Sequence, residues 1–278
     1  MTKVKEITTI IEESAPLFLQ EDYDNSGLVC GDPESEVTSI LLTIDVTEKV
    51  IDEAIAGGHN LILSHHPLVF SGLKNILPDT YVKRCLLKAV RHNLNIYSAH
   101  TNLDAAAAGV SDRMADKLEL KNRKILQPAG KPHSLAESAW NVSPSDSENP
   151  AAGFGIIGEL QEPADPMVFL HRLKQIFKAG VIRHTAICIP EIRRVAVCGG
   201  AGAFLTRTAI AQKADIFISG DFKYHDFFNA ENRLVIADIG HYESEQFTKE
   251  IFYELVTKKL PNFAIQFSKV DTNPVCCL

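Results

Sequence analysis

The sequence predicts an α/β protein built from two similar domains, and three observations support this prediction. Apolar segments of strand length alternate with amphipathic segments of helix length, which is the pattern of a parallel sheet covered by helices. A later stretch of the chain resembles an earlier one in the order of these segments. Histidine and carboxylate residues follow three of the predicted strands, at the sheet edge where ligands of open α/β folds gather.

The composition is that of an ordinary globular protein. The chain has 278 residues, of which 45% are hydrophobic and 23% charged, enough for a large core or two small domains. A net charge of -7 with scattered lysines and arginines argues against nucleic-acid binding. The six cysteines form no CxxC pair, the acidic N-terminal segment is unlike a secretory leader, and the apolar runs are too short to span a membrane. We therefore expect a soluble, cytoplasmic protein with reduced cysteines.

The first half of the chain contains the clearest βαβ pattern. Residues 3–19 show helical spacing that breaks near Pro16, and a turn-rich stretch follows. The pattern then predicts strands over 39–45, 60–66 and 94–100, and helices over 46–58, 81–92 and 109–120. This alternation favours a parallel sheet with helices on its faces.

The second half resumes the alternation after a boundary or loop at 122–150, which is rich in Pro, Ser, Asn and Gly. Strands are expected over 153–160, 181–189 and 193–200, and helices over 163–179 and 242–256. Aligning 195–221 with 40–66 sets Ser219 opposite Ser64, and with one inserted residue His241 and Glu245 fall opposite His100 and Asp104. The identity is weak enough for two generic βαβ units, but the agreement in strand, helix, strand and polar tip favours an internal duplication.

The residues at the predicted strand ends suit a metal site. His65 and His66 end one strand, His100 and Asp104 follow another, and His241 and Glu245 share one face of a helix after a third. A single histidine in such a place is usually a hydrogen-bonded structural residue. Three strand ends that together offer imidazole and carboxylate favour binding of a divalent ion such as Zn, Fe or Mn.

The adjacent histidines further predict two ions. Inside a strand, His65 and His66 would point to opposite faces, but beyond the strand end, which Pro67 helps to set, both rings can turn toward one site. Each ring can then serve a different ion, while Asp104 or Glu245 holds both ions with one oxygen apiece. Such paired ions usually lie about 3.5 to 4 Å apart.

Two further groups of polar residues are open to two interpretations each. Asp221, Lys223 and His225 lie at the predicted strand end equivalent to His65 and His66. Lys223 can hold a phosphate or carboxylate there and His225 can act as a general acid, or the group is a solvated or salt-bridged loop. Asp24 and Asn25 line the site, cap a turn, or do both.

The sequence resembles the GTP cyclohydrolase 1 type 2 homologue family, also called the Nif-three-like dinuclear-metal family. The matching stretches are "DNSGLVCG" (24–31), "SHHPLVF" (64–70), "YSAHTNLDAA" (97–106), "GFGIIGEL" (153–160), "SGDFKYHDFFNA" (219–230) and "DIGHYESEQF" (238–247). The resemblance implies that the metal ligands are His65, His66, Asp104, His241 and Glu245. It also implies that Glu245 bridges the two ions, with Asp104 the competing bridge from spacing alone, and that His100 supports the site without being a primary ligand.

The architecture implied by the resemblance is two similar α/β domains facing each other across a metal-containing cleft, assembled into a ring-shaped homohexamer. Because His241 and Glu245 must meet His65 and Asp104, the C-terminal segment is expected to return to the first domain. We thus expect one domain from 1–127 plus 238–278 and a second from 128–237. The 129–151 stretch is expected to be the remnant of an additional domain that some members of the family carry.

The function implied by the resemblance is hydrolysis by a dinuclear metal centre, in which a metal-activated water opens the guanine imidazole ring of GTP and formate is released. The substrate is then a small molecule, possibly a nucleotide. Two alternatives stay open: a two-metal phosphoesterase, and a non-enzymatic metal-binding hexameric scaffold or regulatory protein. Five protein ligands shared by two ions leave coordination positions for water, which favours catalysis.

Overall fold

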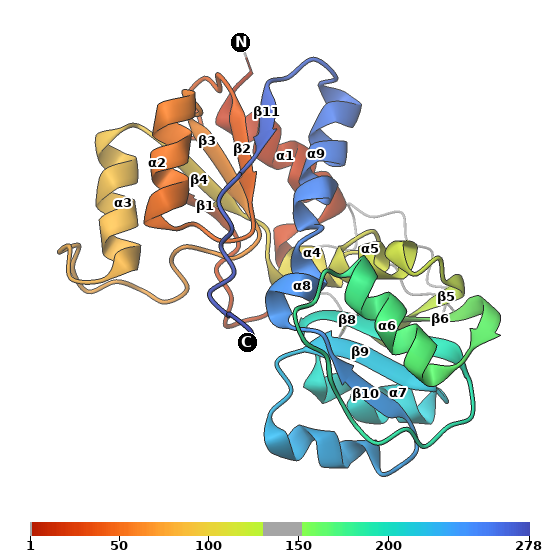
Figure 1. Cartoon of the computed structure of the whole chain (residues 1–278). Coiled ribbons are helices and arrows are strands. Elements are labelled where there is room, and N and C mark those ends of the chain that lie inside the picture. Colours follow the sequence, from red (N-terminus) through yellow and green to blue (C-terminus); the bar gives the residue numbers. More distant parts are fainter. Residues whose placement is uncertain (1, 130–151) are drawn as a thin grey trace. The chain divides into compact units, whose positions relative to one another are not determined.

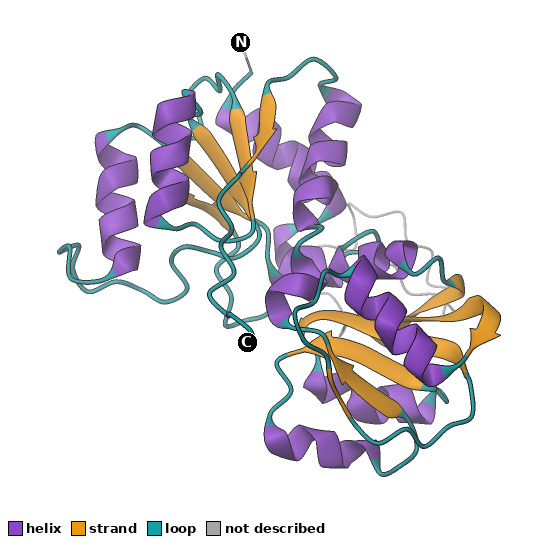
Figure 2. Ribbon diagram, viewed as in Figure 1, coloured by secondary structure: helices purple, strands orange, loops and turns teal. Residues whose placement is uncertain are grey.

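The computed structural model describes residues 2–129 and 152–278, and it is an α/β protein with two separate sheets flanked by helices, as predicted (Figure 2). The expected remnant segment, 129–151, lies outside the described residues apart from Ala129.

The chain forms two compact units. The first contains Met1–Leu103 and Thr248–Pro274, and the second contains Asp104–Phe247 and Val275–Leu278. The C-terminal segment therefore does pack in the first unit, from Thr248 on. These divisions differ from the expected boundaries after 127 and 237, because helix α5 (Val110–Lys117) packs on strands of the second sheet and strand β10 (Val235–Asp238) is part of that sheet.

The sheet of the first unit has the strand order β1-β4-β3-β2-β11. Strands β11, β2, β3 and β4 are parallel, and β1 is antiparallel to β4. Helices α2 and α3 lie on one side of this sheet, and α1 and α9 on the other (Figure 1). The bounds are α1 Val4–Ser14, β1 Gly27–Cys30, β2 Ile40–Thr43, α2 Glu48–Gly57, β3 Leu61–Ser64, α3 Tyr81–Arg91, β4 Asn95–Ser98, α9 Thr248–Lys259 and β11 Ile265–Phe267, with a 3-10 turn η1 at Leu17–Leu19.

Local sequence explains the βαβ unit that carries the histidines. Every residue of β2 and β3 is buried, as expected for strands covered on both faces. Helix α2 begins where the Thr47 side chain accepts a hydrogen bond from the Val50 backbone N–H, and ends where Gly58 adopts a left-handed φ of 70°. On one face, Leu41 and Ile62 pack into the core shared with α2 and α3.

The sheet of the second unit has the strand order β5-β6-β8-β9-β10-β7. Strands β8, β9 and β10 are parallel, and the other pairings are antiparallel. Alternate residues of β8 face opposite cores: Val195 and Val197 pack with α5 and α6, whereas Ala196 and Cys198 pack with α7 and η3. The bounds are β5 Lys121–Pro128, β6 Gly153–Ala164, α6 Pro166–Ile176, β7 Arg183–His184, β8 Ile192–Ala201, η2 Ala203–Leu205, α7 Thr206–Ala211, β9 Ile216–Gly220, η3 Tyr224–Ala230 and α8 His241–Glu245, with α4 (Thr101–Ala105) where the units meet in sequence.

The strands paired by the sequence repeat occupy corresponding places. Strands β2, β3 and β4 are successive parallel neighbours in the first sheet, and β8, β9 and β10 are successive parallel neighbours in the second. An internal duplication would produce this correspondence, and it stays a prediction, as does a cleft between the domains.

Several expected elements differ from the structure. Strand β5 occupies the beginning of the expected loop 122–150, because it is a polar edge strand with an irregular register near Lys121 and little apolar pattern. The expected strand over 181–189 is only the two-residue edge strand β7. The expected helix over 242–256 is divided into α8 and α9. The short strands β1 and β11 were not expected. Across 2–129 and 152–278, the helices fall short of the length and apolarity that crossing a membrane requires.

Candidate metal centre

His65 and His66 lie directly beyond strand β3, as expected. Both of their backbone N–H groups donate to the Ile44 carbonyl, at 3.1 and 3.0 Å, so the chain turns instead of continuing as a strand. The two imidazole rings consequently lie near each other, with centroids 4.9 Å apart. The turn thereby removes the alternation that would have pointed neighbouring side chains to opposite faces.

His100 joins these two histidines. It lies beyond β4, the parallel neighbour of β3, and its ring centroid is 5.3 Å from that of His65 and 5.3 Å from that of His66. One ligand nitrogen from each of the three residues lies within 4.8 Å of the other two. The first unit therefore presents a cluster of three imidazoles that can hold a metal ion.

Hydrogen bonds fix the rings of His65 and His66. Nδ1 of His65 is 2.8 Å from the Ala99 carbonyl oxygen, and Nδ1 of His66 is 2.7 Å from Oδ1 of Asp45. Both partners are acceptors, so each Nδ1 carries the proton and Nε2 is the nitrogen with the coordinating lone pair. The other Asp45 oxygen, Oδ2, accepts from the Thr272 hydroxyl at 2.7 Å. Asp45 was not singled out from the sequence, although its place two residues after strand β2, at the same sheet edge, was a usable signal.

Asp24 caps a turn, which is one of the two roles considered for it, and it also supports a histidine. It caps the turn by accepting from the Asn25 backbone and the Ser26 hydroxyl, and it accepts from Nδ1 of His100 at 2.8 Å. Its side chain is fully buried. Burial by itself would raise the pKa of Asp24, but hydrogen bonds from His100 and Thr101 hold this pKa well below its usual value. Asn25 ties the turn to the loop after β3, since its Nδ2 donates to the Val69 carbonyl at 2.6 Å.

His241 and Glu245 lie together on α8 in the second unit. Nε2 of His241 is 3.0 Å from Oε2 of Glu245, and Nδ1 of His241 is 2.8 Å from Oδ2 of Asp221. Burial alone would lower the pKa of His241, but the carboxylates of Glu245 and Asp221 raise it to about 11. The carboxylates thus favour the protonated form of His241, and a metal cation would compete with a proton for its Nε2. The same contact with His241 lowers the pKa of Asp221.

Glycines at the ends of β8 and β9 make room for these two side chains. At Gly200, where φ is +62°, an added Cβ would clash with Oε1 of Glu245, and at Gly220 it would lie 2.7 Å from the His241 backbone nitrogen. The turn is tied to α8, because the Gly200 N–H donates to the Ser244 hydroxyl at 2.9 Å. The sequence showed the glycines of "CGGAGAF" but not this role, because the fold alone brings residues 200 and 245 together.

Asp104 lies on α4, in the part of the chain that belongs to the second unit. Burial raises the pKa of the Cys198 thiol, and the carboxylates of Asp104 and Glu245 raise it further. Both carboxylates therefore lie close to the end of β8. The second unit thus offers one imidazole and two carboxylates, a harder ligand set than the three imidazoles of the first unit.

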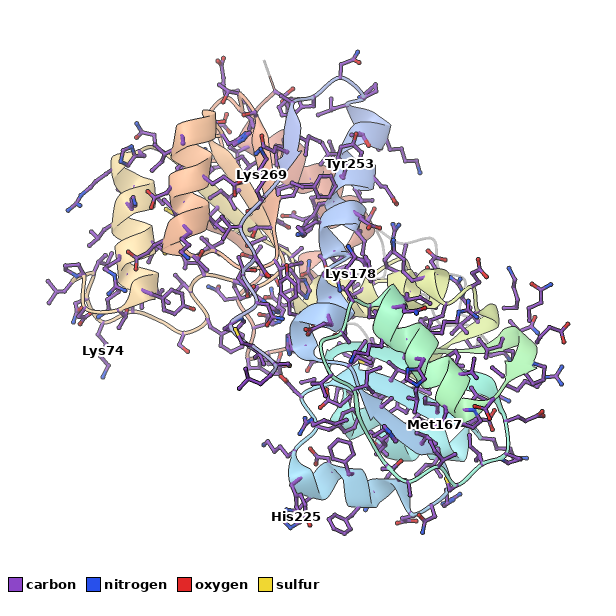
Figure 3. All side chains as sticks on the ribbon, viewed as in Figure 1. Lys74, Met167, Lys178, His225, Tyr253 and Lys269 are labelled. Carbon is purple, nitrogen blue, oxygen red and sulfur yellow. The ribbon has the colours of Figure 1, made fainter. Side chains whose placement is uncertain are left out.

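Lys223 and His225 lie apart from these groups. Both are exposed, and Lys223 begins η3 with its backbone N–H donating to Asp226 at 2.8 Å. His225 packs against Tyr224, with ring centroids 5.1 Å apart, and projects outward near the beginning of η3 (Figure 3). Within the described part of the chain, no hydrogen bond or ion pair joins either side chain to His241 or Glu245. Their roles toward a substrate stay predictions, whereas Asp221 holds the ring of His241.

Comparisons with known proteins place the chain in a family. The model of the Duf34/NIF3 (NGG1p interacting factor 3) family matches residues 2–274. A protein of Clostridium perfringens called "GTP cyclohydrolase 1 type 2 homolog" is 35% identical over 244 residues, covering 87% of each chain. A protein of the same name from Campylobacter jejuni is 28% identical over 277 residues, covering 98% of each.

Solved structures agree with this match. The crystal structure of a Bacillus cereus protein related to NIF3 superposes with a TM-score of 0.87 and 26% identity, over 100% of this chain and 99% of that one. The expected family resemblance is thus confirmed by both sequence and fold. The chain belongs to the Duf34/NIF3 (NGG1p interacting factor 3) family.

Proposed function

We propose that this protein is a dinuclear metal-dependent hydrolase. In this proposal two divalent ions, Zn, Fe or Mn, are held by five residues, of which Glu245 bridges both ions: His65, His66, Asp104, His241 and Glu245. The proposal is supported by the family resemblance at these positions. It is also supported by the hydrogen bonds within each unit that orient the histidine rings.

The observation that carries the proposal is the common hydrogen bonding of the histidines. Each of His65, His66 and His241 has Nδ1 on an oxygen acceptor, at 2.7 to 2.8 Å, and in two cases that acceptor is an aspartate. This arrangement is common among metal-binding histidines that coordinate through Nε2, because an acceptor on Nδ1 orients the ring and makes the coordinating nitrogen more basic.

Burial of Glu245 supports the same conclusion. Its side chain is 2% exposed, and an ionised carboxylate in such a place must be compensated by positive charge. The proton on His241 compensates it in the metal-free chain, and divalent ions would do so in the loaded protein. When bound, paired divalent ions lower the pKa of a coordinated water toward neutrality and stabilise negative charge that develops on the substrate.

The residues of the chain have separate tasks in this reaction. Asp45 and Asp221 hold the rings of His66 and His241, so the ligand atoms are positioned before the ions arrive. Gly200 leaves the space that Glu245 occupies. Five protein ligands leave several positions of two ions open for water and substrate, which a purely structural centre would close.

The substrate class comes from the relatives. Several are called "GTP cyclohydrolase 1 type 2 homolog", and we propose accordingly a purine nucleotide such as GTP. Hydrolysis would add one water at the carbon between the two imidazole nitrogens of guanine and break one of its bonds to nitrogen, which leaves a formamide. A second water would break the remaining carbon–nitrogen bond and release the carbon as formate. A phosphoesterase would release phosphate from the same nucleotides.

The experiment that tests the function separates these products. The full-length protein is stripped of metal, reloaded with Zn, Mn or Fe in parallel, and incubated with a panel of nucleotides while formate and phosphate are measured separately. We expect formate from GTP, and loss of that formate in Glu245→Gln. The matched control is Glu191→Gln, which changes an exposed glutamate in the same unit and should keep full activity.

Two outcomes would overturn the proposed cyclohydrolase. Phosphate without formate would identify a phosphoesterase. Two bound ions with no turnover of any nucleotide would favour a metal-binding scaffold or regulatory protein.

A further inference from the structure

Two exposed aromatic side chains lie beside the histidines of the first unit. Tyr23, in the turn-rich stretch before β1, is 63% exposed, and Phe70, in the loop after β3, is 48% exposed. Their ring centroids are 6.1 Å apart, and the centroid of Phe70 is also 6.1 Å from that of His100. The aromatic pair therefore lies one ring contact from His100, whose own ring borders those of His65 and His66.

The backbone that carries the two rings is fixed, although the rings themselves are exposed. Next to Tyr23 stands Asp24, whose side chain is fully buried. Next to Phe70 stands Val69, whose carbonyl accepts a hydrogen bond from Nδ2 of Asn25 at 2.6 Å. This bond joins the two loops that carry the rings. A surface held in place before a ligand arrives loses little conformational entropy on binding, which favours affinity.

Exposure separates this pair from the aromatic residues of the core. Tyr97, Phe169 and Phe217 are no more than 1% exposed. A single exposed aromatic residue is common on protein surfaces, but Tyr23 and Phe70 contact each other and continue to a histidine of the proposed site. Together they present an apolar surface of ring faces and edges, on which another planar ring can stack.

The geometry of the pair defines where such a ring can lie. A planar ring inserted between two others requires about 3.5 Å on each side and parallel planes. The planes of Tyr23 and Phe70 are tilted by 38° and their centroids are only 6.1 Å apart. A ligand ring therefore stacks on a face of the pair that is open to solvent, and does not enter between the two side chains.

The proposed reaction brings the base of the substrate to the same place. The carbon that water attacks belongs to the imidazole ring of guanine, so the base itself must reach the ions, and not only the phosphates. The aromatic pair borders the histidines that would hold one side of the metal centre. Stacking is an interaction that every base can make, because every base has a π-face.

We propose that Tyr23 and Phe70 form an aromatic platform on which the planar purine base of the substrate stacks while it reacts at the metal centre. The inference rests on the proposed function for its choice of a purine nucleotide, and it leaves the proposed ligand set unchanged. The platform binds and orients the base. Neither ring is assigned a proton transfer or a bond to metal.

The test measures binding without turnover. The zinc-loaded, full-length protein is titrated in a calorimeter with a deaza analogue of GTP, in which a carbon replaces the imidazole nitrogen that carries no sugar, so that this ring cannot be opened by hydrolysis. Inorganic triphosphate, which has no base, is titrated in parallel. We expect Tyr23→Ala and Phe70→Ala each to weaken binding of the analogue by about 5 to 150-fold, the usual loss when a ring that stacks on a base is removed. Binding of triphosphate and the metal content should stay unchanged.

Matched variants separate stacking from a general disturbance. Tyr23→Phe and Phe70→Tyr keep a ring at each position and should retain the affinity for the analogue. Tyr253→Ala removes another exposed tyrosine of the first unit, which pairs with Phe267 at 5.4 Å between centroids, and it should also leave the affinity unchanged. An unchanged affinity in both alanine variants, or equal losses for the analogue and for triphosphate, would overturn the inference.

A contact between copies of the chain is the other use of an exposed aromatic pair. Light scattering on the unaltered protein and on Phe70→Ala measures the mass of the assembly, and we expect the same mass for both. A smaller assembly in Phe70→Ala, together with an unchanged affinity for the analogue, would assign the pair to a subunit contact and overturn the platform.

A second measurement covers the case in which the alanine variants do not fold. Crystals of the unaltered, zinc-loaded chain are soaked with the deaza analogue. We expect atoms of the base within about 4 Å of the ring of Tyr23 or Phe70. A base bound elsewhere, or no binding of the analogue to the unaltered protein, would refute the platform.

These measurements keep the platform and the proposed reaction apart, because none of them involves turnover. A protein that stacks the base but releases no formate from GTP would count against the hydrolase alone. A protein that releases formate equally well with and without the two rings would count against the platform alone.

Discussion

The ligand-bearing ends of the two units use one framework for different chemistry. In both, the proposed ligands follow parallel strands, but the first unit presents imidazoles held by fixed acceptors and the second presents one imidazole beside a buried carboxylate, that of Glu245. The repeat sets Asp221 opposite His66 and Gly200 opposite Asp45. A proposed ligand of the first unit, His66, therefore corresponds to a supporting residue of the second, Asp221. A supporting carboxylate, that of Asp45, corresponds to Gly200, which leaves space for Glu245.

This comparison teaches that similar strand ends do not imply similar ligands. What is common to both units is the support of Nδ1, supplied by Asp24 and Asp45 in the first and by Asp221 in the second. The supporting residues come from different elements in each case. Each variant below changes a residue of only one of the two units.

The largest effect is expected at Glu245. Glu245→Gln keeps the shape of the side chain but removes its negative charge. The second unit then loses the buried carboxylate that would balance the charge of a bound cation. We expect loss of one of the two ions and a fall in turnover of more than about 100-fold, beyond the loss typical for outer partners of a ligand. Metal analysis and initial rates check this. A variant that keeps two ions would show that the second unit does not depend on the Glu245 carboxylate to hold a cation.

The supporting aspartates should give the next largest effects. Asp45→Asn in the first unit and Asp221→Asn in the second each replace a charged acceptor of Nδ1 by a neutral one. We expect each to weaken the binding of one ion by about 10 to 100-fold while the chain stays folded. Competition with a coloured chelator measures this, and losses confined to one of the two variants would show that the units are not supported alike.

Gly200→Ala tests the space beside Glu245. Gly200 has a φ of +62° and its added Cβ would meet Glu245, whereas Gly58 has a φ of +70° with nothing within 4 Å. Both Gly200→Ala and Gly58→Ala should cost about 1 to 2 kcal/mol of stability for a left-handed alanine. Only Gly200→Ala should also weaken metal binding, and equal metal affinities in the two variants would argue against the glycine's role.

The smallest effect concerns stability and pH. The lowered pKa of Asp24 means that its stabilisation is complete above its unfolded pKa of about 3.9 and is lost as pH falls through the lower folded pKa. Asp24→Asn should thus reduce stability at pH 7 by about 2 kcal/mol, the size of a hydrogen bond to a charged group. Below a pH of about 3.9 the difference from the unaltered chain should shrink. Urea unfolding at several pH values measures it, and a difference independent of pH would be contrary to this account.

The sequence predicted much of the strand framework and the gathering of histidines at strand ends, because both depend on local pattern. The alternation of apolar segments showed β2, β3, β4, β6 and β8, and the adjacency of His65 and His66 at a strand end follows from the order of residues alone. Strands β1, β5 and β11 were missed, since short or polar edge strands lack the apolar run of buried ones.

The supporting residues could not be predicted in the same way. Asp24 and His100 are 76 positions apart, and Asp221 and His241 are 20 apart. Such pairs form only when the fold brings separate loops to one sheet edge, so neither spacing nor residue type reveals them. Asp45 is the exception, because an acidic residue two residues after a buried parallel strand already lies at that edge.

The most direct test of the central claim is the number of metal ions per chain. Native mass spectrometry of the stripped and zinc-reloaded full-length protein counts them without any assumption about the substrate. We predict two zinc ions per chain in the unaltered protein and in Glu191→Gln, and fewer than two in Glu245→Gln. Fewer than two ions in the unaltered, fully loaded protein would contradict a dinuclear centre.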